Sequence, residues 1–188
     1  MAAFQNLLSI LEELTTDAQQ VSQEKVEQLE KLMLDANRIS VAGAGRSGFV
    51  ARAFSNRLFH LGLDVHFVGE PTCPSIRKGD LLLIGSGSGT TKGMVLNAET
   101  ALKEGAKVAT VTTNEAGTIA NMSDVAILVP GSAARSNTVS QKKAPTIQPK
   151  GSSFEQLTWL IYDGIVVDLK KALNQSQEQM NYRHANME

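Results

Sequence analysis

The sequence has only one cysteine, few aromatic residues, almost no net charge and no long apolar run. Cys73 is the single cysteine among 188 residues, which excludes an intrachain disulfide and is typical of a reducing cytoplasm. The net charge of -1 at pH 7 gives no general attraction to nucleic acid, whose phosphates require clustered Lys and Arg. No apolar run is long enough to span a bilayer, and the amino terminus lacks the pattern of a signal peptide. The sequence therefore predicts a soluble, cytoplasmic protein.

Residues 1–36 predict two helices. Apolar residues recur at helical spacing in two stretches, the first starting at Phe4 and the second at Val26. Over residues 1–35 there are seven acids (Glu12, Glu13, Asp17, Glu24, Glu27, Glu30, Asp35) and two bases (Lys25, Lys31). This balance argues against a helix pair that reads DNA.

From Arg38 onward, short β-branched apolar runs alternate with helical patterns. The expected strands lie near 39–43, 64–68, 80–85, 107–112 and 124–130, and the expected helices near 47–62, 90–104, 115–122 and 152–174. Several strands are apolar on both faces, as strands covered by helices on both sides must be. The pattern predicts an α/β fold with a doubly wound, five-stranded parallel sheet. We expect a single domain at 1–188, with a helical extension at 1–36, an α/β core at 38–175 and a tail at 176–188.

Two loops rich in glycine and hydroxyl residues each join a predicted strand to a predicted helix. The first is Gly43-Ala44-Gly45-Arg46-Ser47-Gly48, and the second runs from Gly85 to Thr91 as Gly-Ser-Gly-Ser-Gly-Thr-Thr. Glycine lets the backbone approach a ligand closely, amides at a helix start carry partial positive charge, and hydroxyls add donors. The loops therefore predict a site for an anion, most simply a phosphate.

The first loop also matches the G-x-G-x-x-G pattern of dinucleotide-binding domains. Glu70 follows where a ribose-binding acid would stand. Such a domain needs one glycine loop, however, so this alternative leaves the second loop unexplained. It also requires a substrate domain, for which little sequence remains after the sheet.

Residues 131–151 are polar, lack periodicity and carry Arg135, Lys142, Lys143 and Lys150. A structureless loop of about 20 residues is uncommon inside a compact domain and is often functional. A solvated connector is the equally compatible alternative.

Together these features resemble the sugar isomerase (SIS) domain family and, within it, the 6-phospho-3-hexuloisomerases. Besides the two glycine loops, the resemblance covers five segments: Arg57-Leu58 with His60-Leu61-Gly62, Val68-Gly69-Glu70, Ile147-Gln148-Pro149, Gly151 to Gln156, and Arg183 to Glu188. Asn56 and Lys150 depart from the family pattern, since methionine is expected at both positions. The resemblance covers essentially the whole chain and implies a flavodoxin-like, three-layer α/β/α fold.

The resemblance implies an enzyme that interconverts 3-hexulose 6-phosphate and fructose 6-phosphate, the second step of formaldehyde fixation in the ribulose monophosphate pathway. It also implies a homo-oligomer, usually a tetramer of SIS dimers, and neither a metal nor an organic cofactor. The residues themselves show no metal site, because His60 and His66 lack helical ligand spacing and Cys73 has no thiol partner. The expected partner is a small sugar phosphate, without nucleic acid or membrane.

Moving a ketone from C3 to C2 through a cis-enediol(ate) requires a base, donors for an oxyanion and a grip on the phosphate. The candidates for the phosphate cradle all lie in the second loop: Ser86, Gly87, Ser88, Gly89, Thr90 and Thr91. Ser47, in the first loop, is expected to join them or to bind a sugar hydroxyl. A tight turn with a helix N-cap is the alternative interpretation, and both can hold at once.

The candidate base is Glu155, an assignment that rests on the resemblance of its Gly-Ser-Ser-Phe-Glu segment. The residues alone favour a capping box, with Ser152 as the N-cap and Glu155 three residues later. Arg46 is placed to contact the substrate or steady an oxyanion. Its alternative is a salt bridge to a neighbouring acid such as Glu70.

Three histidines differ in their expected roles. His66 lies within a predicted strand and is expected to be structural. His60, at a helix end, either packs against a neighbour or enters the active site across a subunit interface. His184 lies in a tail that is not expected to hold itself in place, and the resemblance suggests that it docks onto a site, either in its own subunit or in another one. A histidine acid–base is needed only to open the furanose ring of fructose 6-phosphate, because a 3-hexulose 6-phosphate could close through O5 only as a strained four-membered ring.

Two other functions stay open. A non-catalytic sugar-phosphate sensor would use the same cradle, but such proteins normally carry a DNA-binding domain, for which the acidic first 35 residues are too short. An isomerase of another ketose or aldose phosphate would share the same residues.

Overall fold

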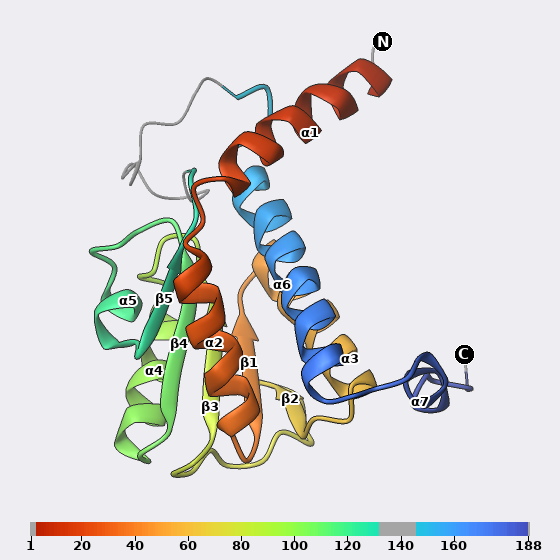
Figure 1. Ribbon diagram of the computed structural model, residues 1–188. Coiled ribbons are helices and arrows are strands. Elements are labelled where there is room, and N and C mark those ends of the chain that lie inside the picture. Colours follow the sequence, from red (N-terminus) through yellow and green to blue (C-terminus); the bar gives the residue numbers. More distant parts are fainter. Residues whose placement is uncertain (1–2, 132–145, 188) are drawn as a thin grey trace.

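The computed structural model describes residues 3–131 and 146–187, in which helices cover both faces of a five-stranded sheet (Figure 1). The strands lie in the order β2-β1-β3-β4-β5, and every neighbouring pair is parallel. Their bounds are β1 Ile39–Gly43, β2 Val65–Phe67, β3 Leu81–Gly85, β4 Lys107–Thr112 and β5 Val125–Leu128. This order is that of flavodoxin-like folds and confirms the predicted doubly wound sheet.

Seven helices are present in the described residues: α1 Ala3–Ala18, α2 Gln23–Asp35, α3 Arg46–His60, α4 Lys92–Lys103, α5 Thr118–Met122, α6 Ser152–Ala172 and α7 Gln177–Tyr182. Two separate hydrophobic clusters show which helices share a face of the sheet. One cluster joins the sheet to α2, α3 and α6, and the other joins it to α4 and α5. The three-layer arrangement and the two N-terminal helices are therefore as predicted.

Strand β3 shows why the sheet has a core on both sides. Leu81 and Leu83 belong to the cluster under α2, α3 and α6, whereas Leu82 and Ile84 belong to the cluster under α4 and α5. All four side chains are buried. Each such side chain contributes about 1.5–3 kcal/mol when it leaves water, so an apolar residue is favoured at every position of the strand.

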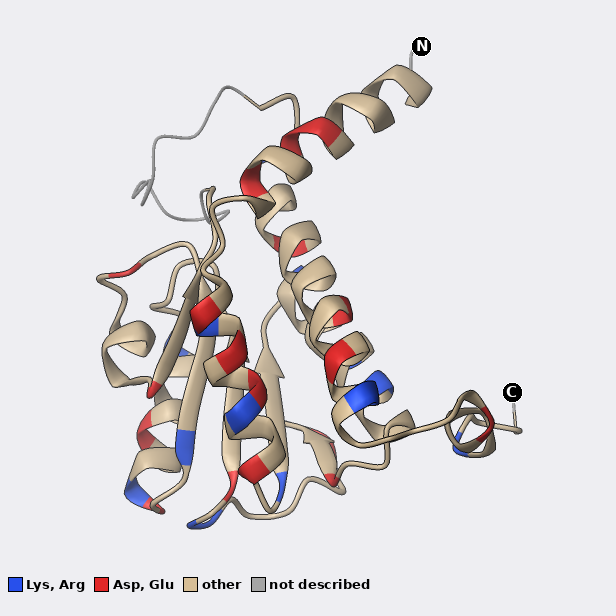
Figure 2. Cartoon of the chain, in the orientation of Figure 1, with Lys and Arg blue, Asp and Glu red and all other residues tan. Residues whose placement is uncertain are grey.

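Helix α1 projects beyond the layered core and packs against the start of α6 (Figure 1). Leu14 is its buried apolar residue, whereas Phe4, Leu7, Leu8 and Leu11 are exposed. Its charged residues are all acidic (Figure 2). The helix thus presents an apolar stripe to solvent, and within the described residues it packs on the core and on α6 through its last turns.

The C-terminal tail is held by its own chain, so the prediction that it could not hold itself in place was wrong. Ser176 and Gln179 form a capping box at the start of α7, with hydrogen bonds of 3.1 and 2.8 Å. Arg183 then donates from Nη1 to the carbonyl oxygen of His60 at 3.1 Å and to Gln175 Oε1 at 2.9 Å. These contacts dock the tail on the last turn of α3.

The polar loop expected at residues 131–151 is described only in part, because residues 132–145 lie outside the described residues. No described helix combines the length and apolar character that a bilayer-spanning segment needs.

Candidate active site

The second glycine loop is held rigidly between β3 and α4. The carbonyl oxygen of Gly87 accepts hydrogen bonds from Thr112 Oγ1 at 3.2 Å, Thr113 Oγ1 at 2.8 Å and the Thr113 amide at 3.1 Å. The carbonyl oxygen of Ser88 accepts from Asn114 Nδ2 at 3.0 Å. Because the loop directs these carbonyl oxygens into the protein, a ligand meets hydroxyl groups and amides instead.

The hydroxyl groups of this loop are mostly free to meet a ligand. Ser86 Oγ is buried and has no hydrogen-bond partner among the described residues. Ser88 Oγ has only long contacts, at 3.3 Å to the Thr90 amide and 3.4 Å to Thr91 Oγ1. A buried hydroxyl without a partner is costly, and a bound anion would supply the missing acceptor.

Gly89 has a different role from the rest of the second loop. Its φ is +63°, and a Cβ there would lie 3.3 Å from Gly117 Cα. Its carbonyl oxygen accepts a hydrogen bond from the Ile119 amide at 2.9 Å. Gly89 therefore fixes the loop against the segment before α5. Ser86, Gly87, Ser88 and Thr91 line the pocket, and Gly89 and Thr90 do not.

The glycines of the first loop allow α3 to approach β1 closely. A Cβ on Gly48 would lie 2.8 Å from the carbonyl oxygen of Gly43, and a Cβ on Gly43 would lie 2.9 Å from that of Ser47. Gly45 turns the chain with a φ of +59°. The same close packing is what brings Arg46 and Ser47 to the pocket.

The starts of α3, α4 and α6 all meet at this pocket. Their N-cap residues are Gly45, Thr91 and Gly151, and none of these helices has a side-chain cap. By contrast, the distant helices α2 and α7 are capped by the side chains of Ser22 and Ser176. Three uncapped helix starts direct partial positive charge and amide donors into one volume, which suits a phosphate.

Glu155 lies in the same pocket and is bound to Arg46. Arg46 Nε donates to Glu155 Oε2 at 2.5 Å, and the Glu155 side chain is 13% exposed whereas that of Arg46 is 66% exposed. The alternative of a Ser152–Glu155 capping box is wrong. Gly151, at a φ of +95°, is the N-cap instead, and this places Glu155 one position too late for a box.

The salt bridge expected as the alternative role of Arg46 is not formed. Glu70 pairs with Arg52 Nη1 at 2.5 Å, so the proposed Arg46–Glu70 pair is wrong. Glu70 does not line the pocket, and its carboxylate already has a cationic partner. The dinucleotide alternative therefore gains no support from this acid.

The pocket has a volume of about 350 Å³ and is mostly walled by backbone, hydroxyl groups, Arg46 and Glu155. This volume is at the small end of the range for ligand sites. A second groove, of about 450 Å³, shares Arg46 and Glu155 as one wall. Its other walls come from α1, α3 and α6 and are apolar except for Gln156: Leu11, Leu14, Phe49, Val50, Gln156, Trp159 and Leu160.

His60 and His184 lie together, but at the far end of α3. Their rings stack with centroids 4.9 Å apart. Burial, followed by the charges of His184 and Arg57, lowers the pKa of His60 below its ordinary value of 6.5. Fourteen helical residues separate His60 from Arg46, which amounts to about 21 Å along the axis. Within one chain, the histidines and Glu155 are therefore not brought together.

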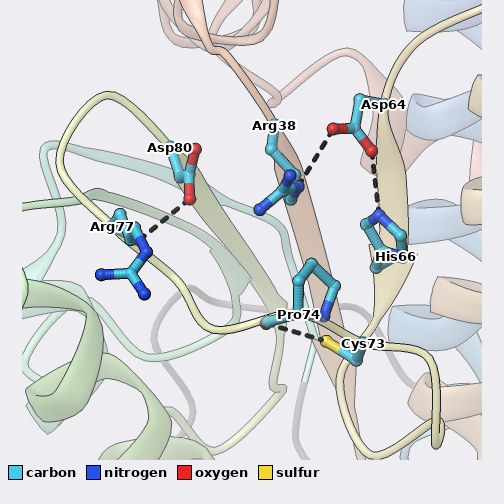
Figure 3. A network of polar contacts seen from close by, with 7 residues as sticks. All are labelled: Arg38, Asp64, His66, Cys73, Pro74, Arg77 and Asp80. Atoms are coloured by element: carbon cyan, nitrogen blue, oxygen red, sulfur yellow. Dashed lines mark hydrogen bonds and ion pairs between the residues drawn. The ribbon is translucent and has the colours of Figure 1, made fainter.

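His66 belongs to a polar network at the amino ends of the strands (Figure 3). Asp64 accepts from Arg38 Nε at 3.0 Å and contacts His66 Nε2 at 2.9 Å. Cys73 lies nearby and contacts the carbonyl oxygen of Pro74. His66 lies within β2, as expected, and is part of this network rather than of the pocket. Across the part of the chain that the structure describes, no three His, Cys, Asp or Glu side chains are grouped as metal ligands would be.

Sequence reasoning missed Glu13 of α1, which contacts the segment leading into α6. Its carboxylate accepts hydrogen bonds from Thr146 Oγ1, the Ile147 amide and Gln148 Nε2. These partners are more than 130 positions away in the sequence. No local signal could have revealed the contact.

Tyr162 was also missed. Its ring stacks on Phe54 with centroids 4.1 Å apart, and its buried Oη has no hydrogen-bond partner among the described residues. A Cβ on Gly85 would lie 3.5 Å from this Oη, so the hydroxyl approaches the end of β3 beneath the pocket. Burial raises the pKa of Tyr162 well above its ordinary value. Tyr162 follows Glu155 by seven residues, about two helical turns, and this spacing was the signal available in the sequence.

Comparisons with known proteins agree with this geometry. A 3-hexulose-6-phosphate isomerase of Bacillus subtilis (strain 168) is 39% identical over 188 residues, which cover 100% of both chains. A crystal structure of a hypothetical protein superposes with a TM-score of 0.87 at 30% identity and covers 98% of this chain and 97% of that one. A hypothetical protein from Methanococcus jannaschii, whose crystal structure is said to infer a function of 3-hexulose-6-phosphate isomerase, gives a TM-score of 0.78 at 29% identity over 98% and 96% of the chains.

The SIS domain family model matches residues 32–148, which include both glycine loops but end before Glu155. The Bacillus subtilis relative extends the similarity over the remaining segments, Glu155 and the tail included. A family model that covers more than half of the chain, together with a full-length relative, shows that this chain belongs to the SIS domain family.

Proposed function

We propose that the protein is a sugar-phosphate isomerase that interconverts 3-hexulose 6-phosphate and fructose 6-phosphate. Membership of the SIS family supports a sugar phosphate as the ligand, and the names of the full-length relatives support this pair of sugars. The reaction would be the second step of formaldehyde fixation through ribulose monophosphate. An isomerase of another sugar phosphate is the alternative.

The observation that carries the proposal is a largely buried carboxylate, that of Glu155, beside an anion cradle. Ser86, Ser88 and Thr91, with the uncapped amides around them, would bind the phosphate. Glu155, in the same pocket, would then reach the carbon atoms near the other end of the sugar. Holding the phosphate fixes the reacting carbons in place, which is a large part of the catalysis in such a reaction.

In the proposed mechanism Glu155 removes the proton from C2 of the 3-ketose. The C2–H electron pair forms the C2–C3 double bond of a cis-enediolate, and the negative charge develops on the former ketone oxygen. Arg46, which lines the same pocket and pairs with Glu155, would stabilise that charge. The hydroxyl proton of O2 moves to O3 as C2 becomes the ketone, and Glu155 returns a proton to C3.

We further infer that His60 and His184 act in the site of a neighbouring subunit. They are too far from Glu155 of their own chain, and α1, α3 and α6 expose Phe4, Phe49 and Trp159 in a way that a homo-oligomer would cover. The expected assembly is a tetramer of SIS dimers. Their task would be to open the fructose 6-phosphate ring, so His184→Ala should lower kcat for fructose 6-phosphate more than kcat for the 3-hexulose. The ratio of the two kcat/KM values is fixed by the equilibrium constant, so kcat is the quantity to compare.

The deciding experiment supplies 3-hexulose 6-phosphate from a synthase and detects fructose 6-phosphate by a coupled assay. We expect turnover in the wild type and a loss of about 10²- to 10⁴-fold in Glu155→Gln, the usual contribution of a general base. Glu99→Gln, on the exposed surface of α4, is the matched control and should keep full activity. Full activity in Glu155→Gln would contradict the proposed base, and no turnover in the wild type would contradict the substrate.

A further inference from the structure

Glu13 connects the projecting helix α1 to the segment 146–151, which leads directly into α6. Glu13 Oε2 accepts from Thr146 Oγ1 at 2.7 Å and from Gln148 Nε2 at 3.0 Å, and Oε1 accepts from the Ile147 amide at 3.2 Å. Three donors from three consecutive residues thus converge on one carboxylate. Hydrogen bonds to an ionised acceptor are stronger than neutral ones, so this is a firm attachment for a short segment.

The attached segment is itself tightly folded. Gln148 is buried, and its amide donates to Thr146 Oγ1 at 3.1 Å. The carbonyl oxygen of Pro149 then accepts from the Ser152 amide at 3.1 Å, which closes the turn that starts α6. The orientation of this turn is therefore set from both sides, by Glu13 before it and by the helix after it.

The turn at the start of α6 decides where Glu155 points. Gly151 adopts the left-handed conformation, and its carbonyl oxygen accepts from the Glu155 amide at 3.2 Å. Glu155 is thus on the first turn of the helix, where a small displacement of the preceding segment moves its carboxylate. The hydroxyl groups of the phosphate cradle, Ser86, Ser88 and Thr91, are carried by a different loop, between β3 and α4, and of residues 146–151 only Gly151 lines the pocket.

We propose that Glu13 is a positioning residue for the reaction, which holds Glu155 in place through residues 146–151. This inference rests on the proposed function. It assigns to helix α1, which also exposes an apolar stripe, a role in catalysis. Because the hydroxyl groups of the cradle lie on the β3–α4 loop, which Glu13 does not contact, losing the carboxylate should impair the chemical step more than the binding of the phosphate.

The test compares Glu13→Ala and Glu13→Gln with the control Glu12→Ala, which removes the preceding carboxylate from an exposed position of the same helix. The first measurement is amide hydrogen exchange of Ile147 and Ser152 in the full-length protein. We expect faster exchange at both amides in Glu13→Ala and no change in Glu12→Ala. Glu13→Gln keeps one oxygen that can accept from Thr146 and Gln148, so its exchange should lie between the two.

The second measurement is steady-state kinetics with 3-hexulose 6-phosphate. We expect kcat to fall about 10- to 100-fold in Glu13→Ala, since a misplacement of about 1 Å can cost this much, with KM changed less than about threefold. Glu13→Gln should recover part of the loss. Melting temperatures close to that of the wild type separate this effect from unfolding, which would lower the active fraction without changing KM or the rate per folded molecule.

Two outcomes would overturn the inference. Unchanged exchange at Ile147 in Glu13→Ala would mean that the carboxylate does not hold the segment. Faster exchange with a kcat equal to that of Glu12→Ala would mean that the position of the segment does not reach Glu155. Absence of turnover in the wild type would instead contradict the proposed function and its catalytic consequence, whereas the exchange data would still decide whether Glu13 holds residues 146–151.

Discussion

The two ends of the parallel strands carry different kinds of polar group. The side of the sheet where the strands begin is called the amino edge, and the side where they end is called the carboxyl edge. At the amino ends of the strands, charged side chains pair with one another: Asp64 with Arg38 and His66, and Asp124 with Lys107 (Figures 2 and 3). At the carboxyl ends, around the pocket, Ser86 Oγ has no partner among the described residues and the helix starts lack side-chain caps.

This difference separates groups that stabilise the fold from groups that await a ligand. The amino edge satisfies its charges internally, so changing one of its residues should cost stability and leave the site intact. The carboxyl edge leaves donors and a hydroxyl unsatisfied, which costs the folded protein free energy until an anion binds. Changes there should mainly affect binding or turnover.

The largest effect is expected where both stability and site depend on one contact. In Gly48→Ala the new Cβ would meet the Gly43 carbonyl oxygen at 2.8 Å, a backbone atom that can give way only if α3 moves off β1. We expect a destabilisation of about 1–3 kcal/mol, as for other overpacked sites, and a loss of kcat/KM of about 100-fold as Arg46 and Ser47 move.

The control for this prediction is Gly164→Ala, an exposed glycine inside α6 with no atom within 4 Å of the built Cβ. Alanine there should stabilise the protein by up to about 1 kcal/mol, because glycine weakens a helix interior. Denaturant unfolding and the coupled assay measure both variants. A Gly48→Ala protein as stable and active as the wild type would show that α3 can move away from β1 without loss of stability or activity.

The next effect isolates the carboxyl edge. Ser86→Ala removes a hydroxyl that has no partner in the free protein, so the free energy of unfolding should stay within about 0.5 kcal/mol of the wild type or rise. Binding of fructose 6-phosphate, measured by calorimetry, should weaken about 10-fold or more, since hydrogen bonds to a charged group are worth about 1.5–3 kcal/mol.

Ser55→Ala is the matched control for that variant. Ser55 is buried in α3, and its Oγ donates to the carbonyl oxygen of Ala51 at 2.9 Å. Its removal should cost stability and leave the affinity unchanged. An unchanged affinity in Ser86→Ala would mean that the hydroxyl of Ser86 does not contact the phosphate. The contrast between the two edges would then not hold at this residue.

A smaller effect is expected from the amino edge. Burial raises the pKa of Asp124, but hydrogen bonds from Lys107 Nζ and the Val108 amide outweigh it and hold the pKa below the ordinary value of 3.8. A depressed pKa stabilises the fold above the unfolded value, and this stabilisation is lost as the pH falls through the folded value. Asp124→Asn should therefore cost about 1 kcal/mol at neutral pH and progressively less below about pH 4. Its kcat and KM should equal those of the wild type, and a changed KM would show that the two edges are coupled.

The sheet and most helices could be predicted from the sequence because their signals are local. Runs such as Leu81 to Ile84 are apolar at every position, and both glycine loops follow strands at the edge where ligands bind. Helix α7 was missed because six residues are too few for a clear apolar period. Its capping box at Ser176 was nevertheless visible in the sequence.

The pairing of charges within the site could not be predicted in the same way. The alternative role of Arg46 was a salt bridge to a nearby acid such as Glu70, but its partner is Glu155, 109 positions away. Glu13 is tied to Thr146 across 133 positions. Such contacts depend on how α1, α3 and α6 pack on one another. The local sequence predicts where the helices start, but not which helices lie side by side.

The smallest effect concerns the histidine pair at the end of α3, where the amino edge meets the tail. The pKa of His60 is lowered by burial, then by the charges of His184 and Arg57, whereas in the unfolded chain it keeps its ordinary value of 6.5. Below about pH 6.5 the unfolded chain therefore takes up a proton before the folded protein does, so stability falls as the pH drops from there toward the lower folded pKa. Above about pH 6.5, His60 is neutral in both states and its protonation no longer changes the stability. We expect the melting temperature of the wild type to fall more between pH 7.5 and pH 5.5 than that of His60→Asn, with smaller protection factors for the amides of Arg183 and His184 at the lower pH. An equal fall in melting temperature in both proteins would mean that other titrating groups cause the pH dependence. Protonation of His60 would then not loosen the tail from α3.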